Sequence, residues 1–235
     1  MGTLISASPA TGVTFDLESS TVTDLNQALH RAAAGTAWEV LNPRGQHAIA
    51  AGLDQELTVL IRGHVGYYCA GMNERASLVI EGNAGVGLAE NMMSGRVHVK
   101  GSASQSAGAT AHGGLLVVDG DAAARCGISL KGADIVVGGN VGHMSAFMAQ
   151  AGRIVICGDA GDALGDSIYE ARLYVKGQVA SLGADCVAKE MRPEHLAELA
   201  QLLQAAGRPE RAEDFRRYGS ARQLYNFHID NASAY

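Results

Sequence analysis

The feature that most constrains this chain is a series of glycines that recurs with a constant 19-residue period. The series, which we refer to as the ladder glycines, comprises Gly63, Gly82, Gly101, Gly120, Gly139, Gly158 and Gly177. Equal spacing over seven positions indicates an internal repeat, and a repeat of this length determines the architecture before any local motif is considered. The sequence therefore predicts a stack of equivalent structural units.

A short aliphatic pattern precedes each ladder glycine. Four residues before it stand Val59, Leu78, Val97, Leu116, Ile135, Ile154 and Leu173. Two residues before it stand Ile61, Ile80, Val99, Val118, Val137, Ile156 and Val175. Alternation with period two is typical of a β-strand that buries one face. We therefore expect every repeat to begin with a short strand whose aliphatic residues point inward.

Small residues mark the rest of each repeat. The position two after the ladder glycine holds alanine or valine throughout, and the position seven after it holds only alanine or glycine. Coils stacked at ~4.8 Å would place parallel sheets along three sides, and seven of them would stand ~34 Å tall. The sequence predicts an all-β-dominated fold of about seven 19-residue coils, a parallel β-helix. Because this period lacks a strict six-residue subrepeat, we expect the right-handed form.

The repeat stops short of both ends of the chain, so we expect three regions. Residues 1–52 should form a small N-terminal α/β cap, 53–190 the β-helix, and 191–235 C-terminal helices with an aromatic tail. The cap should contain a helix from about Asp24 to Ala34, then two strands joined by a turn at 42–45. The C-terminal region should contain a helix from Pro193 and a second short helix over about 209–218. Both end regions would cover the open ends of the stack.

Charge and composition narrow the function classes. The formal net charge is −6 and the basic residues are scattered, which gives no footprint for nucleic acid or an anionic membrane surface. No apolar run approaches the ~20 residues of a membrane span. We expect a cytoplasmic protein without nucleic-acid or membrane partners, and four dispersed cysteines suit reduced thiols.

The repeat also shows which reactive side chains can meet. Cys69 and Cys126 occupy the same position three coils apart, hence ~14 Å, and cannot share a disulfide or a metal ion. A zinc site is disfavoured because four histidines occupy four different positions, namely His64, His98, His112 and His143. Asp166 and Asp185 lie one period apart and would stack at ~5 Å. Such a pair could act as the acid and base of a sugar-cleaving enzyme, but carboxylate pairs are more often neutralised by solvent or by a nearby Lys or Arg. We therefore expect no catalytic, cofactor-binding or metal-binding residue in this chain.

Several long strings resemble one protein family. They are GYYCAGMNE (66–74), AENMMSG (89–95), RCGISLKG (125–132), VGHMSAFMAQAG (141–152), GDAGDALGDSIYEA (158–171), LGADC (182–186) and the tail YGSARQLYNFHIDNASAY. Together they resemble the stand-alone β-helix subunit of N-methylglutamate synthase, which is related to the C-terminal domain of the glutamate synthase large subunit. The arginine-asparagine-serine-glycine segment usual in that domain is not found, which favours the methylamine enzyme.

The resemblance implies a complex of three kinds of subunit in which this chain is a non-catalytic scaffold. The implied partners are a glutamine-amidotransferase-like chain and an FMN-binding, glutamate synthase-like chain with an iron–sulfur cluster. The implied reaction converts methylamine and L-glutamate to N-methyl-L-glutamate and ammonia. The transferase activity would then belong to the complex, and the cofactors to the partner subunit.

Other functions stay open from the residues alone. One is a β-helix subunit of a glutamate synthase-like or formylmethanofuran dehydrogenase-like complex, and another is a polysaccharide-acting β-helix enzyme that works alone. For the scaffold role, we expect bulky side chains on the coil turns and in the tail either to contact partners or to pack on this chain. These are Tyr67, Tyr68, Met72, Phe147, Met148, Tyr225, Phe227 and Tyr235.

Overall fold

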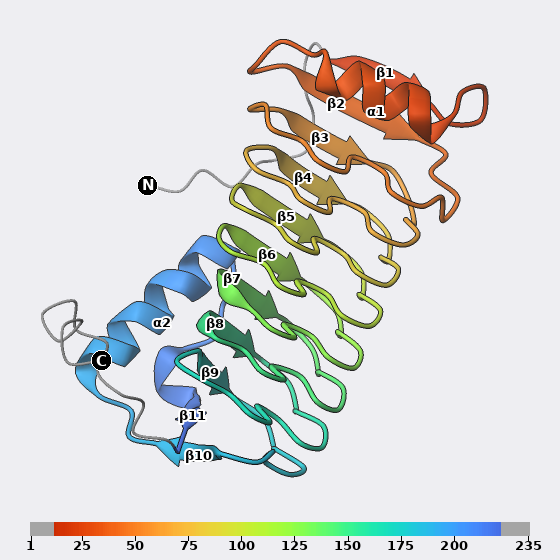
Figure 1. Cartoon of the computed structure of the whole chain (residues 1–235). Helices are drawn as coiled ribbons and strands as arrows, with labels where there is room; N and C mark the ends of the chain where they lie inside the picture. Colours follow the sequence, from red (N-terminus) through yellow and green to blue (C-terminus); the bar gives the residue numbers. More distant parts are fainter. Residues whose placement is uncertain (1–11, 222–235) are drawn as a thin grey trace, which may run out of the picture.

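The computed structural model describes residues 12–221, and Figure 1 shows a stack of coils with one long helix along its side. In chain order the elements are β1 (Val13–Asp16), α1 (Val22–His30), β2 (Ala37–Leu41), β3 (Thr58–Ile61), β4 (Ser77–Ile80), β5 (Arg96–Val99), β6 (Leu115–Val118), β7 (Lys131–Val137), β8 (Ala151–Ile156), β9 (Arg172–Val175), β10 (Cys186–Lys189), α2 (Pro193–Ala206), the 3-10 turn η1 (Ala212–Asp214) and β11 (Arg216–Ser220). Within this part of the chain, no helix has both the length and the apolar content needed to cross a membrane.

The stack is a parallel β-solenoid, and this confirms the predicted fold class. Strands β3 to β9 make seven consecutive turns, each paired in parallel with the next. Apart from a bulge where Lys131 of β7 pairs with Ala151 of β8, the offset between paired strands equals the glycine period, as in Val59 with Leu78. All the aliphatic residues four and two before the ladder glycines are buried, in one continuous core. Each coil therefore buries its apolar face only against its neighbours in the stack.

Only one side of the solenoid is a continuous sheet, so the prediction of sheets along three sides is wrong. The second side is held by single bridges at the small residues two after each ladder glycine, from Val65 to Val179. The third side consists of overlapping turns, with positive φ at residues such as Tyr68, Ala70 and Met72. These turns still bond to the next coil, since the Tyr68 N–H donates to the Val86 carbonyl (2.9 Å). A chain that curves this tightly cannot keep extended strand geometry, whereas a series of turns can.

The third side also explains the small residues seven after each ladder glycine. Gly108 has φ +67°, and a Cβ added there would lie 2.5 Å from Ile135 Cδ1. Gly127 has φ +68° and stands against Ile154 in the same way. Where this position holds alanine before the last coil, as in Ala89, the residue is fully buried, whereas Ala184 in the last coil is exposed. A larger side chain would overlap the inward aliphatic residues of the strands, because the interior is close-packed.

The N-terminal helix is present but shorter than predicted. Thr21 caps α1 in a capping box with Asp24, and the helix ends at His30 rather than near Ala34. Leu25 is fully buried in the core cluster. The chain leaves the helix early because it must turn back into β2, which lies in the sheet and not beside it.

Regular pairing begins before the expected boundary at residue 53. Strand β2 pairs in parallel with β3, Ala37 with Thr58, at an offset slightly longer than the glycine period. The segment that follows, predicted as a second strand, is a series of turns in which the Ala48 N–H donates to the Tyr67 carbonyl (2.7 Å). It takes this form because the turns of the next coil need hydrogen-bond partners on this side.

Helix α2 lies along the outer face of the sheet and not over an end of the stack (Figure 1). It ends at Gly207, which has φ +69°, as the glycine signal predicts. Its leucines form a second buried cluster with outward side chains of the sheet, namely Val117, Val136, Val155 and Tyr174. Strands β6 to β9 are therefore buried on both faces, whereas the period-two pattern predicts one buried face.

The prediction of a second C-terminal helix is wrong. The 3-10 turn η1 is followed by β11, which inserts antiparallel between β9 and β10. Tyr218 pairs with Leu173 on one side and Ala188 on the other. Without β11, the last ladder strand would present unpaired N–H and C=O groups, so a strand is the better partner there than a helix.

Candidate partner-binding face

The ladder glycines are explained by the polar residue that follows each of them. The Asp121 carboxylate accepts a hydrogen bond from the Asn140 N–H (2.6 Å), and the Asn140 side chain accepts one from the Asp159 N–H (2.8 Å). The same bond recurs along the stack through His64, Asn83, Ser102, Asp121, Asn140, Asp159 and Gln178, a series that we refer to as the polar ladder. A Cβ at Gly139 would collide with the Asp121 carboxylate. Glycine is needed there because the coils approach closely, not because a ligand binds.

The cysteines do not form a reactive or metal-binding group. All four are free and buried. Burial raises the pKa of Cys69 and Cys126 to about 12, and burial raises the pKa of Cys157 and Cys186 to about 11. Such thiols stay protonated at neutral pH and are poor nucleophiles. Over residues 12–221, no group of three or more His, Cys, Asp or Glu side chains could hold a metal ion.

Asp166 and Asp185 do not stack as the repeat predicts. The bridge between Leu164 and Leu182 has an offset that is one residue shorter than in the coils above it. Asp166 therefore lies opposite Ala184, whose N–H donates to its carboxylate (3.3 Å). The 19-residue periodicity fails in the last coil, so the repeat no longer supports an acid/base pair of Asp166 and Asp185.

The predicted partner-contact residues within 12–221 lie on the third side of the solenoid. Tyr67, Met72 and Met148 have 57%, 49% and 40% of their surface exposed. Tyr68 and Phe147 are half-buried. The other three predicted residues lie outside the described part of the chain, namely Tyr225, Phe227 and Tyr235.

Further large apolar side chains are exposed on the same side. We refer to the outward residues four to twelve positions after each ladder glycine as the turn side, visible as loops on the side of the stack away from α2 (Figure 1). Outside strand β10, its exposed large apolar residues are Tyr67, Met72, Val86, Met93, Met148, Tyr169 and Leu182. Val86, Met93, Tyr169 and Leu182 were not predicted from the sequence. Their signal is a bulky side chain at a position that is polar or small in most other coils.

The side chain of Tyr67 is held in place by a neighbouring residue of its own chain. Its ring stacks on the ring of His47, with centroids 4.5 Å apart and planes at 15°. The Tyr67 N–H donates to His47 Nδ1 (3.0 Å). An aromatic side chain held in this way loses little conformational freedom when a partner covers it, so it suits an anchor position in an interface.

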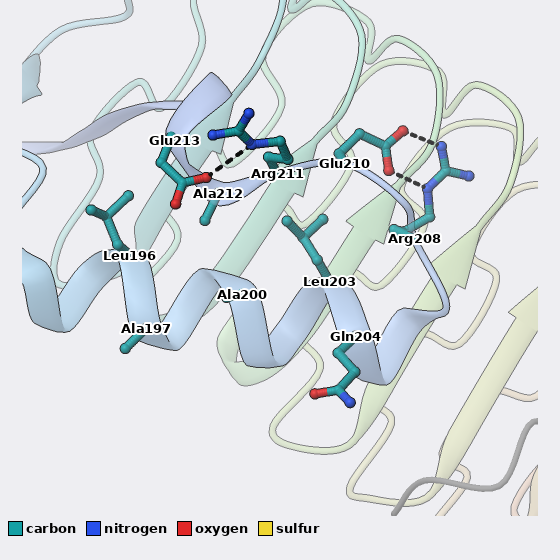
Figure 2. A pocket seen from close by; sticks show the side chains of 10 residues that line it. All are labelled: Leu196, Ala197, Ala200, Leu203, Gln204, Arg208, Glu210, Arg211, Ala212 and Glu213. Carbon is teal, nitrogen blue, oxygen red and sulfur yellow. Dashed lines mark hydrogen bonds and ion pairs between the residues drawn. The ribbon is translucent and has the colours of Figure 1, made fainter.

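A shallow groove lies beside α2, with a volume of about 480 Å³. Figure 2 shows the residues that line it, namely Leu196, Ala197, Ala200, Leu203, Gln204, Arg208, Glu210, Arg211, Ala212 and Glu213. Its charged groups are paired with each other, Arg208 with Glu210 at 2.6 Å and Arg211 with Glu213 at 3.5 Å. The lining therefore offers apolar contact but no set of groups suited to acid/base or nucleophilic chemistry.

Residues 12–221 define a class of protein, a parallel β-solenoid whose exposed apolar residues gather on the turns between its strands. No family model matches the sequence. Over 224 residues the chain is 61% identical to protein GlxC of Rhizobium meliloti (strain 1021), covering 94% of this chain and 98% of GlxC. The chain belongs to the GlxC family, whose name states no reaction.

Proposed function

We propose that this chain is the non-catalytic scaffold subunit of a cytoplasmic, FMN-dependent N-methylglutamate synthase complex. The complex would convert methylamine and L-glutamate to N-methyl-L-glutamate and ammonia. A glutamine-amidotransferase-like chain and an FMN-binding, glutamate synthase-like chain with an iron–sulfur cluster would supply the reactive groups and cofactors. Since the GlxC name states no reaction, the support comes from the family resemblance and from the location of the resembling strings in the fold.

That location is the observation that carries the proposal. The string GYYCAGMNE contains Tyr67 and Met72, AENMMSG contains Met93, and VGHMSAFMAQAG contains Met148. All four residues are exposed and belong to the turn side. A resemblance to the family that includes exposed apolar residues favours a shared binding surface, because the core of the solenoid does not require large apolar side chains at these positions.

The construction of the solenoid suits a positioning role. Strand pairing on one side, single bridges on the second and the polar ladder link every coil to the next. A solenoid bonded in this way resists bending and offers a long surface. Tyr67 and Met148 belong to coils four steps apart, hence ~19 Å along the stack. A partner chain bound at Tyr67 and another molecule bound at Met148 would be held at a fixed separation.

A polysaccharide-acting enzyme is the weaker candidate. It would need two carboxyl groups facing each other across a sugar, and the best pair predicted from the sequence is Asp166 and Asp185. The shortened offset at the bridge between Leu164 and Leu182 removes their stacking.

Affinity purification of the full chain from the cells that produce it tests the scaffold proposal. We expect two further chains and a flavin absorbance spectrum, and the complex should form N-methylglutamate from methylamine and glutamate. Co-purifying pterin-processing chains would indicate a formyl-transferring complex, and glutamate formed from glutamine would indicate a glutamate synthase. Elution of the chain alone and without colour contradicts the proposal.

A pair of substitutions tests the binding surface itself. Tyr67→Ser together with Met72→Ser removes two exposed anchors and should lower recovery of one partner chain by about tenfold or more. The matched control is Gln105→Ser with Thr110→Ser, which changes the same two positions of the coil two steps further along. Equal recovery with both pairs would show that the apolar anchors do not bind a partner.

A further inference from the structure

The coil that begins at Gly139 exposes apolar side chains that the solenoid itself does not need. Met148 is exposed, and Met144 and Phe147 are half-buried beside it on the turn side. Met144 and Met148 both have φ of +53°. This conformation is strained for residues other than glycine, asparagine and aspartate, so methionine is a costly choice there. An apolar side chain that is exposed on a strained backbone indicates contact with another surface.

The two neighbouring coils carry opposite charges beside this apolar coil. The preceding coil exposes Arg125 and Lys131, and the following coil exposes Asp162 and Glu170. Asp162 accepts a hydrogen bond from the Ser181 hydroxyl (3.0 Å). The ion pairs formed within residues 12–221 include none of these four side chains. Their charges are therefore available to another molecule.

The positions of these charges along their coils match in pairs. Arg125 stands five after its ladder glycine and Asp162 four after its own. Lys131 stands eleven after its ladder glycine and Glu170 twelve after its own. The basic residues lie one coil before the apolar coil, and the acidic residues lie one coil after it. Each basic residue therefore has an acidic counterpart at nearly the same position along its coil. Such a surface is complementary to its own copy turned end for end.

From this pattern we infer that the turn side around Gly139–Cys157 binds a second copy of this chain, with the two solenoids antiparallel. The two-fold axis lies in the interface and crosses this coil, as a symmetric dimer requires. Met144, Phe147 and Met148 pack against the same residues of the second copy. Arg125 faces Asp162 of the second copy, and Lys131 faces its Glu170.

The same symmetry defines which other residues meet. Ile128 would face Asp166 of the second copy, an apolar residue opposite a carboxylate. That carboxylate already accepts hydrogen bonds from the Ser167 hydroxyl (2.8 Å) and the Ala184 N–H (3.3 Å), so it does not depend on a new partner. The interface reaches two coils to either side of the axis, because the solenoid ends there in β10. Tyr67 lies four coils from the axis and outside the interface, free for the partner chains of the proposed function.

Sedimentation velocity of the purified full chain tests the inference. Because the contact spans about five coils, we expect a weak dimer with a dissociation constant of ~1–100 μM. Arg125→Asp and Asp162→Arg should each raise that constant about tenfold or more, since each places like charges opposite one another twice. The double variant should restore dimerisation, because both pairs are then re-formed with reversed signs. A chain that stays monomeric at ~300 μM, or a double variant no better than the single ones, overturns the inference.

Two further variants separate the apolar contact from the overall fold. Met148→Ser puts at this position the residue that Ser129 and Ser167 supply in the adjacent coils, and it should weaken the dimer about tenfold. Tyr67→Ser, on the same side but outside the interface, should leave the dimer unchanged, and circular dichroism should show both variants folded. Dimerisation that responds to Tyr67→Ser but not to Met148→Ser contradicts this assignment. The measurement needs no other subunit, so its outcome is independent of whether the proposed partner chains are found.

Discussion

At the residue scale, Asn73 shows why one member of a repeat can depart from the rest. It lies ten after its ladder glycine, where other coils hold Met92, Leu130 and Ile168. Asn73 is fully buried. Its Nδ2 donates to the Ala76 carbonyl (2.9 Å), and its Oδ1 accepts from the Ala76 N–H (3.2 Å). The amide therefore satisfies backbone groups at the turn before β4.

The exchange Asn73→Leu tests this role. It would make the coil resemble its neighbours, yet it should lower the free energy of unfolding by about 2 kcal/mol, because buried backbone groups lose their partners. Urea unfolding followed by circular dichroism measures the change. Met92→Leu at the equivalent position keeps volume and polarity and should cost below about 1.5 kcal/mol. A stability gain in Asn73→Leu would mean that apolar filling matters more at this position than the hydrogen bonds.

At the element scale, Glu198 fastens helix α2 to the sheet. Its carboxylate accepts hydrogen bonds from Arg172 (2.8 Å) and from the Tyr174 hydroxyl (2.7 Å), and lies 3.5 Å from Arg153 Nη1. Burial acts to raise the pKa of Glu198, but the Tyr174 hydrogen bond and the charges of Arg172 and Arg153 outweigh it and lower the pKa. The folded chain therefore favours the ionised carboxylate.

This pKa direction predicts how the attachment of α2 depends on pH. A carboxyl group with a lowered folded pKa stabilises the fold fully above its unfolded pKa, and that stabilisation is lost as pH falls through the folded pKa. In Glu198→Gln, the fall in melting temperature between about pH 5 and pH 3 should be shallower than in the parent chain. Glu194→Gln, at an exposed carboxyl group of the same helix, should keep the parent profile. Identical profiles for the parent and Glu198→Gln would contradict the assigned role of Glu198.

What could be predicted from the sequence depends on whether a signal is local. Strands β3 to β9 and helix α2 follow from glycine spacing, period-two alternation and the flanking Pro193 and Gly207. Strand β11 has no such signal in Arg216–Ser220, and it forms because β9 and β10 leave backbone groups to pair. The positive φ of Arg125 is likewise imposed by stacking, since arginine has no local preference for it.

The same distinction applies to the candidate partner-binding face. Tyr67 and Met148 could be chosen from the sequence, because bulk at a turn position is visible in the repeat. Met93 and Tyr169 are bulky at a turn position in the same way, but that they point outward follows only from the path of the turns between the strands. The error over Asp166 arose because a missing residue in the last coil changes the register and leaves no mark in the ladder glycines.

At the scale of the whole molecule, the polar ladder ties the coils into one body. Its hydrogen bonds, such as that from the Ser102 N–H to Asn83 Oδ1 (2.9 Å), recur at a constant offset through the solenoid. From Gly101 to Gly177 each bond needs the ladder glycine beside it, because a Cβ would occupy the position of the accepting side chain, and at Gly82 a Cβ would meet the backbone of Gly63. Stability of the stack therefore depends on each interface between neighbouring coils.

Gly139→Ala tests this dependence in the middle of the stack. The new methyl group would displace the Asp121 carboxylate from the Asn140 N–H, and the free energy of unfolding should fall by about 2 kcal/mol or more. Adding Asp121→Ala should cost less in this background than in the parent chain, because the displaced carboxylate no longer contributes. Gly45→Ala is the control, since its φ is +71° with no atom within 4 Å of the added Cβ, and it should cost about 1–2 kcal/mol. Fully additive effects of Gly139→Ala and Asp121→Ala would contradict the model of a steric conflict.

The constant offset of the polar ladder also limits how genes for such chains can change. A single codon gained or lost within the central coils shifts every later side chain relative to the backbone group it should meet, unless a local bulge absorbs it. The strand offset departs from its constant value near the two ends, being longer between β2 and β3 and shorter between Leu164 and Leu182, and in the middle of the stack only at a bulge where Lys131 pairs with Ala151. Inherited variation in length should therefore come as duplication or loss of whole windings, with small insertions confined to the first and last.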